Sequence, residues 1–263
     1  MYSFELHKAD SVANAAALLA QSGGKPLAGG QSLVAAMKMR LAQPTALVDL
    51  SGIAELKGIR KEGDNLVIGA MTRHAEVAAS KVAQEAIPAL AALAEGIGDR
   101  QVRNMGTLGG SLANNDPAAC YPAAVLGLGA TIHTNKRKIA ADDFFKGMYE
   151  TALADGELIT SVSFPIPKKA AYMKFVQPAS RFALVGVFVA QTGGGVRVAV
   201  TGAAPSVFRA KPLEDALTKN FSADAAKAVK IADASLNNDL HGSPAYRAHL
   251  VSVMASRAVA AAG

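Results

Sequence analysis

The sequence has few of the residues from which disulfides, metal clusters and nucleic-acid interfaces are built. Its 263 residues include one cysteine, Cys120, and no tryptophan, and only 5% of them are aromatic. One thiol cannot form an internal disulfide, and it cannot by itself hold a zinc ion or an iron–sulfur cluster. If this protein carries electrons, the carrier on this chain is therefore not a cysteine-bound cluster.

Long apolar runs are also lacking. No stretch reaches the roughly 18 consecutive apolar residues that cross a bilayer. The first ten residues carry Glu5 and Asp10 instead of a basic start followed by an apolar core, so they do not have the pattern of a secretory signal. Because the chain also has a single cysteine, we expect a cytoplasmic protein without a membrane span.

Charged residues make up only 18% of the chain, and their balance is mildly basic. Lysine and arginine number 27 against 21 aspartate and glutamate, which gives a net charge of +6. The densest basic runs, at 136–138 and 168–169, contain no aromatic residue, so a solvated turn and a linker explain them better than a nucleic-acid interface. We expect no nucleic acid partner, whereas an anionic ligand or an acidic partner subunit suits this balance.

Apolar residues are abundant, and they predict a folded chain of more than one domain. Hydrophobic residues make up 51% and the mean hydropathy is +0.21, which excludes a disordered chain. At roughly 150 residues per domain, the length predicts two or three small domains. The run Pro165-Ile166-Pro167-Lys168-Lys169 is the clearest boundary between them.

Residues 1–56 are predicted to form a small α/β unit, because strand and helix signals alternate there. Asp10-Ser11 and Gly23-Gly24 delimit an alanine-rich helix. The elements that follow are a strand, a glycine turn, a helix and a strand, at 26–28, 29–30, 31–41 and 45–50.

Residues 57–167 are predicted to form a second unit, and 170–263 a C-terminal α+β domain in which strands precede helices. The second unit has hairpins turning at 62–65 and 135–136, helices at 72–80 and 87–95, and a strand at 157–165. The C-terminal domain has strands at 172–176, 182–191 and 196–201, then helices at 210–219, 223–236 and 244–261.

Two glycine-rich segments depart from the ordinary pattern of strands and helices. The first, 27–33, has the sequence LAGGQSL and lies between a strand and a helix. Its glycines permit positive φ and close backbone approach, and free N–H groups at a helix start suit an anion such as a pyrophosphate. A plain glycine turn is the alternative, and it is the commoner structure for one such segment alone.

The second segment, 104–117, has the sequence NMGTLGGSLANNDP, which again sets paired glycines beside hydroxyl and amide side chains. Neither segment is a dinucleotide fingerprint of the G-x-G-x-x-G kind or a P-loop. Two such segments in adjoining units suggest one diphosphate held from both sides, and hence a nucleotide cofactor. Just before the second segment, Arg103 is a candidate for fixing its position.

Together, AGGQSL and VRNMGTLGGSLANNDPAA resemble the two flavin-binding signatures of the FAD (medium) subunits of molybdenum hydroxylases, the relatives of xanthine dehydrogenase and carbon monoxide dehydrogenase. The resemblance covers nearly the whole chain and extends to DFFKGMYETAL and ELITSVSFP. It implies an α+β fold: an FAD-binding fold of the vanillyl-alcohol-oxidase (PCMH) type with two subdomains, followed by a C-terminal α+β domain.

The resemblance also implies a set of residues that bind FAD. For the diphosphate the set is Leu27, Ala28, Gly29, Gly30, Gln31, Ser32 and Leu33 on one side, with Thr107, Gly109, Gly110 and Ser111 on the other. Further positions matched to the cofactor are Asn114, Ile159, Lys174 and Phe182, the last three close to its isoalloxazine ring.

One position departs from the family pattern. Relatives usually carry DPAAD, in which the last aspartate is a polar ligand of FAD, whereas this chain has Cys120 there. A thiol is a weaker hydrogen-bonding group than a carboxylate. We expect FAD to bind nevertheless, with that contact weakened or taken over by Asp116 or water, and Cys120 to pack as a small buried hydrophobic residue.

The function implied is that of an electron-transfer subunit. In the family, substrate is hydroxylated at a molybdopterin cofactor on a large subunit, and electrons cross two [2Fe–2S] clusters on a small subunit to FAD and then to an acceptor. The flavin supplies the redox chemistry and the protein supplies binding and orientation. A dimer of heterotrimers is a plausible assembly by resemblance. A self-contained FAD oxidase and a flavin-free scaffold are the alternatives, and the substrate and the acceptor stay open.

Overall fold

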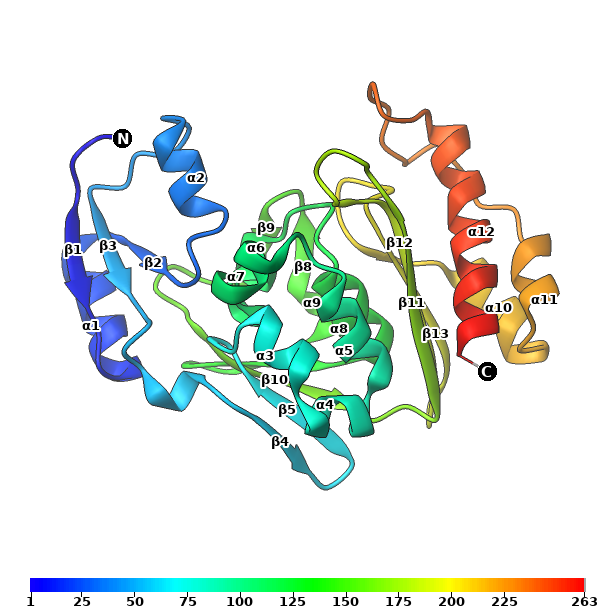
Figure 1. Ribbon diagram of the computed structural model, residues 1–263, viewed down its shortest axis with the longest axis horizontal. Coiled ribbons are helices and arrows are strands. Elements are labelled where there is room, and N and C mark those ends of the chain that lie inside the picture. Colours follow the sequence, from blue (N-terminus) through cyan, green and yellow to red (C-terminus); the bar gives the residue numbers. More distant parts are fainter. Residues whose placement is uncertain (263) are drawn as a thin grey trace.

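The computed structural model describes residues 1–262, and in it three units lie side by side in chain order (Figure 1). A small N-terminal sheet lies at one end, a group of short helices over a second sheet lies in the middle, and a third sheet backed by helices lies at the other end. The mixed α and β composition agrees with the fold class expected from the sequence.

The N-terminal unit is a parallel sheet against which the helix α1 packs. Its strands have the order β1-β3-β2. Ser11 caps the helix by accepting a hydrogen bond from the Asn14 N–H, and Gly23 ends it at φ +61°. The elements are β1 (Glu5–Lys8), α1 (Val12–Ser22), β2 (Lys25–Leu27), α2 (Leu33–Lys38), β3 (Ala46–Asp49) and the short 3-10 helix η1 (Ala54–Leu56).

The helix expected through residue 41 is shorter than predicted. It ends at Lys38 because Arg40 adopts a left-handed conformation, with φ +61°, and the Leu41 N–H turns back to the Ala36 carbonyl. Side chains from the helix α1, from β3 and from η1 close a small core that includes Ala15, Leu19 and Val48.

The central unit is a five-stranded antiparallel sheet, in the order β4-β5-β10-β6-β7, with short helices packed against it. Both predicted hairpins are present, β4–β5 and β6–β7. The strands are β4 (Ile59–Glu62), β5 (Asn65–Gly69), β6 (Thr131–Thr134), β7 (Lys138–Ala140) and β10 (Ile159–Pro165), and β8 (Phe145–Gly147) with β9 (Glu150–Thr151) forms a separate hairpin.

The helices of the central unit outnumber those the sequence predicted. The segments expected at 72–80 and 87–95 are the helices α3 and α5, but most of the glycine-rich stretch from 96 to 122 is helical as well. The helices are α3 (His74–Ala79), α4 (Lys81–Ala86), α5 (Pro88–Glu95), α6 (Arg100–Met105), α7 (Leu108–Asn114), α8 (Tyr121–Leu128) and α9 (Ala141–Phe144). Among them α8 is buried along its whole length, so it forms the centre of the largest core.

The C-terminal unit has its strands before its helices, as predicted. The sheet, in the order β11-β12-β13-β14, lies between the central helices α5 and α8 on one face and α12 on the other (Figure 1). The elements are β11 (Lys169–Val176), β12 (Ala183–Thr192), β13 (Gly195–Thr201), β14 (Phe208–Arg209), α10 (Lys211–Lys219), α11 (Ala223–Ala228) and α12 (Pro244–Ala261).

The helix predicted over 223–236 is wrong in its second half. It ends at Ala228 as α11, and the following segment is held by tertiary hydrogen bonds instead of helical ones. The Val229 carbonyl accepts from the Ser252 hydroxyl at 2.7 Å, and the Asn237 N–H donates to the Ala203 carbonyl at 2.9 Å. Contacts with α12 and with the turn after β13 therefore override the local helical pattern.

Candidate functional site

A cavity of about 460 Å³ opens between the N-terminal and central units and reaches the first strands of the C-terminal unit. All of the site residues predicted from the sequence line it, although they come from segments far apart in the chain. They are Leu27, Ala28, Gly29, Gly30, Gln31, Ser32, Leu33, Thr107, Gly109, Gly110, Ser111, Asn114, Asp116, Cys120, Ile159, Lys174 and Phe182.

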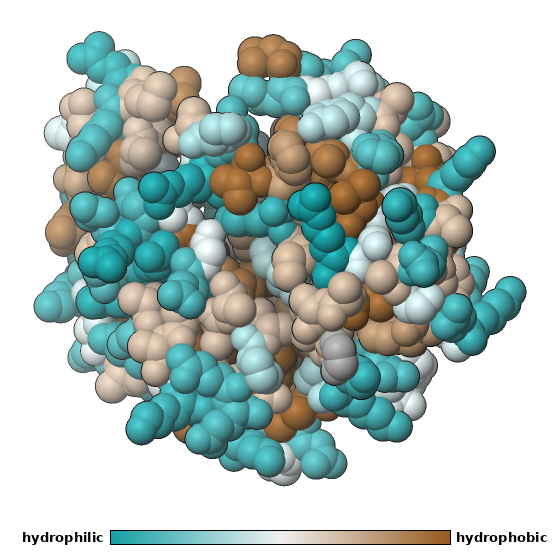
Figure 2. All heavy atoms as spheres, turned by 45° about the vertical axis from the view of Figure 1, so that its right-hand side comes forward, coloured by the Kyte–Doolittle hydropathy of each residue, from teal (hydrophilic) through white to brown (hydrophobic). Residues whose placement is uncertain are grey.

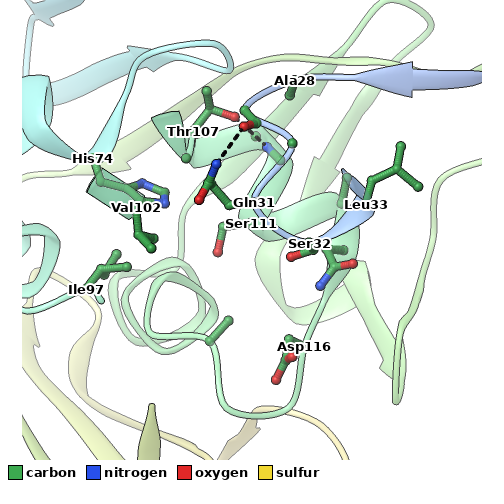
Figure 3. A pocket seen from close by; sticks show the side chains of 18 of the residues that line it. Ala28, Gln31, Ser32, Leu33, His74, Ile97, Val102, Thr107, Ser111 and Asp116 are labelled. Atoms are coloured by element: carbon green, nitrogen blue, oxygen red, sulfur yellow. Dashed lines mark hydrogen bonds between the residues drawn. The ribbon is translucent and has the colours of Figure 1, made fainter. Parts of the chain in front are cut away.

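The first glycine turn presents unused hydrogen-bond donors. It follows directly on β2, and Gly30 has φ +71°, a conformation that favours glycine. Within the described residues, the backbone N–H groups of 29–33 donate to no protein acceptor. The Gln31 side-chain amide folds back on the Gly29 carbonyl at 3.2 Å (Figure 3). Such a row of free amides suits a negatively charged group.

The two glycine turns touch each other. A Cβ on Gly29 would collide with the Met105 carbonyl oxygen and would lie 2.8 Å from the Gly106 Cα. On the other side, a Cβ on Gly110 would lie 3.4 Å from the Ala28 Cβ. Only glycine at 29 permits this backbone-to-backbone approach, so the prediction that both turns face one ligand is consistent with their positions.

The second turn differs from the first because its amides are already used. The Leu108 N–H donates to the Thr72 carbonyl at 3.1 Å, and the Gly109 N–H donates to the Ala70 carbonyl at 2.8 Å. The buried Thr107 hydroxyl accepts from the Gly110 N–H at 3.2 Å and so caps the helix α7. On this side of the cavity, side chains rather than backbone N–H groups are left for a ligand.

Behind α7 the chain is held by two hydrogen-bonded polar residues. Asn115 is buried and has φ +43°, and its Nδ2 donates to the carbonyls of Gly147 and Glu150, both at 2.8 Å. The Asp116 carboxylate accepts from the Ala118 N–H at 2.8 Å and from the Tyr149 hydroxyl at 3.3 Å. The hairpin β8–β9 is thereby tied to the wall of the cavity.

Cys120 and Lys174 meet at the far side of the cavity. The Lys174 Nζ donates to the carbonyls of Gly96 at 2.7 Å and Arg181 at 3.0 Å, and it lies 3.6 Å from the Cys120 Sγ. Cys120 is buried in the central core, as expected of a small hydrophobic residue. Within the described residues, no carboxylate lies within 4 Å of the lysine, so its charge is held in a fixed place without a neutralising partner.

Arg103 contacts the loop before the second turn. Its guanidinium donates to the carbonyls of Ile97 at 2.9 Å and Gly98 at 3.2 Å, and both of these residues line the cavity. The hypothesis that an arginine fixes this part of the chain is in keeping with these contacts.

Glu157 also lines the cavity, although no sequence pattern indicated it. Its carboxylate is buried and accepts from Arg137, from the Thr134 hydroxyl and from the Ala154 N–H. The hydrogen bond from Arg137 is the main cause that lowers the pKa of Glu157 to about 2. Because every oxygen is paired, this carboxylate supports the wall next to Ile159.

Sequence reasoning also missed His74, for which a search by metal-ligand spacing has no signal. It is the first residue of α3, it is 5% exposed, and it lines the cavity beside Val102 (Figure 3). Burial, with a smaller contribution from the Arg103 charge, lowers the pKa of His74 to about 4. The imidazole is therefore neutral near pH 7.

Metal-ligand clusters and membrane-spanning helices are absent from the part of the chain that the structure describes. Residues 1–262 contain no group of three or more His, Cys, Asp or Glu side chains placed to hold a metal ion. None of the helices there is long and apolar enough to cross a membrane.

The cavity fits a dinucleotide such as FAD. Its volume falls within the range of small-molecule and cofactor sites, it has free backbone donors at one end for a diphosphate, and its lining is largely apolar elsewhere. At Gly29 and Gly109 a Cβ would meet the backbone of a neighbouring segment, so the shape of the cradle depends on these glycines. The arrangement suits a flavoprotein, in which the chain binds and orients a redox cofactor.

Family comparisons agree with this site. Residues 2–167 match the FAD binding domain in molybdopterin dehydrogenase, and residues 170–262 match the C-terminal domain of the CO dehydrogenase flavoprotein. The chain belongs to this family, the FAD-binding medium subunits of molybdenum-containing oxidoreductases.

Individual relatives cover nearly the whole chain. The carbon monoxide dehydrogenase medium chain of Hydrogenophaga pseudoflava is 37% identical over 98% of this chain and 96% of its own length. The nicotine 6-hydroxylase medium subunit of Paenarthrobacter nicotinovorans is 37% identical over 91% of this chain and 89% of its own. The structure of reconstituted CO dehydrogenase from Oligotropha carboxidovorans superposes with a TM-score of 0.91 at 35% identity, over 99% of this chain and 98% of that one.

Proposed function

We propose that this subunit passes electrons from [2Fe–2S] clusters on a small partner subunit, through FAD in the cavity, to an external acceptor. Substrate would be oxidised at a molybdopterin cofactor on a large partner subunit. The observation that carries the proposal is that one cavity collects every residue assigned to FAD from the sequence. FAD, when bound, accepts and releases electrons one or two at a time.

The residues of this chain would bind and orient the cofactor. The free N–H groups of 29–33 would donate to the diphosphate, and Ser111 and Asn114 would contact it from α7. Ile159 and Phe182 offer apolar surface to the ring, and Lys174 offers a fixed positive charge. Positive charge near a flavin favours its reduced, more electron-rich form.

Cys120 stands where relatives usually have an aspartate, but a carboxylate is still present nearby. Asp116 lies on the same cavity wall, and one of its oxygens is engaged by the Tyr149 hydroxyl at the limit of a hydrogen bond, 3.3 Å. This carboxylate would take over the polar contact that a longer acidic side chain at 120 makes in relatives.

The proposal extends to the organisation and assembly of the chain. We place the FAD-binding subdomains at 1–56 and 57–167 and the C-terminal domain at 170–263. The small and large subunits would bind this chain in a heterotrimer, with a dimer of heterotrimers as the assembly, in the cytoplasm. The core of residues such as Ala15 and Val48 is distinct from the core around α8, which supports two subdomains.

The purified protein tests the proposal directly. We expect a yellow protein with flavin absorption bands, and we expect tagged chain expressed with its neighbouring genes to bring down a larger and a smaller subunit that carry molybdenum and iron. A colourless chain that takes up no FAD would support the scaffold alternative. An isolated chain that oxidises a substrate unaided would support the self-contained oxidase.

A further inference from the structure

The imidazole of His74 is buried without the hydrogen bonds that such a group normally has. Its Nδ1 is inaccessible to solvent and has no partner among the described residues. Its Nε2 is not among these inaccessible atoms, so Nε2 is the nitrogen that opens on the cavity. Its ring lies 5.3 Å, centroid to centroid, from that of Tyr121 in a tilted arrangement. A neutral imidazole has one donor and one acceptor, and buried polar groups are rarely left unpaired.

The position of His74 is fixed by the second glycine turn. Its backbone N–H donates to the Gly106 carbonyl at 3.0 Å. A Cβ on Gly106 would lie 2.6 Å from the His74 Nε2, so only glycine at 106 leaves room for the ring edge. Since Gly29 packs on the same Gly106 backbone, the imidazole stands where the two turns meet, at the margin of the cavity (Figure 3).

We propose that His74 is a further cofactor-binding residue. Its Nε2, the imidazole nitrogen that faces the cavity, donates a hydrogen bond to an oxygen of the bound dinucleotide where the glycine turns meet. This inference rests on the proposed function and deepens it. The expected acceptor is the diphosphate, because Gly29, the first residue of the segment with free amides, packs on the Gly106 backbone beside the His74 Nε2. The other nitrogen, Nδ1, stays in the interior.

The charge state of the ring suits this role. Burial and Arg103 hold the pKa of His74 near 4, so the imidazole keeps a neutral N–H donor at the pH of the cell. Hydrogen bonds to charged acceptors are stronger than those between neutral groups. A cofactor oxygen would pair Nε2, while Nδ1 stays buried without a partner.

The substitution His74→Phe separates a binding role from a structural one. Phenylalanine keeps the ring beside Tyr121 and removes both nitrogens. We expect the variant without cofactor to melt at the same temperature as the native chain or higher, because an unpaired buried polar group is gone. We expect its dissociation constant for FAD, measured by quenching of flavin fluorescence, to rise about tenfold to a hundredfold.

Ligand fragments locate the contact. ADP, which carries the diphosphate, should lose affinity for His74→Phe by a similar factor, whereas riboflavin should bind both proteins alike. Tyr121→Phe is the matched control: it removes the neighbouring buried hydroxyl, which also lacks a partner, and should leave the FAD affinity unchanged.

Two results would overturn the inference, and they are distinguishable from each other. If His74→Phe binds FAD as tightly as the native chain, His74 has no part in binding, while the proposed function stands. If the native chain itself binds no FAD, the proposed function fails and this inference fails with it.

Discussion

At the scale of single residues, the site depends on groups whose partners are missing or unusual for their type. His74 lacks hydrogen bonds, Lys174 lacks a carboxylate, and the amides of 29–33 lack acceptors within the described chain. In an ordinary core such groups are paired. Their concentration around one cavity is a physical reason, apart from any likeness of sequence, to propose it as the functional site.

The low pKa of His74 makes folding depend on pH. Between 6.5, the ordinary pKa of histidine, and about 4 the unfolded chain binds a proton that the folded chain does not. Stability from this group is therefore complete above pH 6.5 and is lost as pH falls toward 4, by about 3 kcal/mol at pH 4. We expect urea unfolding without cofactor to show this loss in the native chain, and a smaller loss in His74→Phe. Equal slopes against pH in both proteins would contradict the assignment.

The fixed charge of Lys174 should affect the reduction potential of the bound flavin. Lys174→Met removes the charge and keeps the chain length, so we expect a lower midpoint potential, measured by equilibration with a reference dye. A tenfold change in the preference for reduced cofactor corresponds to about 30 mV for two electrons.

Lys169→Met is the control for that measurement. It makes the same change of net charge on the same strand β11, at an exposed position five residues away, which is roughly 16 Å along a strand. We expect no change of potential there. A shift of the same size in both variants would mean that net charge, and not the placement of Lys174, sets the potential.

At the scale of elements, the candidate phosphate site is built from two glycine turns in close contact, and neither turn is a dinucleotide fingerprint or a P-loop. We expect Gly29→Ala to abolish FAD binding and to cost about 1–3 kcal/mol of stability, because its Cβ would collide with the backbone at Met105. Gly193→Ala is the control, since a Cβ there meets nothing within 4 Å. Binding by flavin fluorescence and unfolding in urea measure both effects, and normal binding by Gly29→Ala would refute the contact.

Local sequence signals correctly predicted the elements whose bounds are set by neighbouring residues, such as caps and hairpin turns. The cap at Ser11, the hairpins β4–β5 and β6–β7 and the strand-then-helix order of the C-terminal unit agree with the structure. The helix expected to 236 failed because Ser252 and Ala203 hold the chain from a distance. The helices α6 and α7 were not expected, since glycine, asparagine and aspartate have poor helix propensity and tertiary packing decides there.

The parts of the candidate site that lie in short contiguous segments could be predicted from the sequence. The parts that depend on contacts between distant segments could not. Paired glycines and hydroxyls indicated both turns from the sequence. Nothing local shows that the amides of Gly109 and Leu108 are used by Ala70 and Thr72, or that His74 reaches the cavity, because each depends on where another strand lies.

At the scale of the whole molecule, the cavity draws its walls from all three units. Hydrophobic and hydrophilic residues are interspersed on the face shown in Figure 2. A ligand that binds only the folded chain stabilises it by mass action. We expect FAD at a hundredfold excess over its dissociation constant to add about 2.7 kcal/mol, seen as a rise in melting temperature.

A control makes that thermal measurement specific. ADP would contact fewer of the cavity walls, so we expect it to bind more weakly than FAD. At the same multiple of its own dissociation constant it should raise the melting temperature equally, which requires a higher concentration of ADP. If FAD leaves the melting temperature unchanged at saturating concentrations, the folded chain has no site for it.

The unbonded amides of 29–33 also have a consequence for hydrogen exchange. Without cofactor these N–H groups have no protein acceptor among the described residues, so we expect the turn to exchange hydrogen with water at the rate of an open segment. Bound FAD would supply an acceptor, and we expect hydrogen exchange at 29–33 to slow when the cofactor is added.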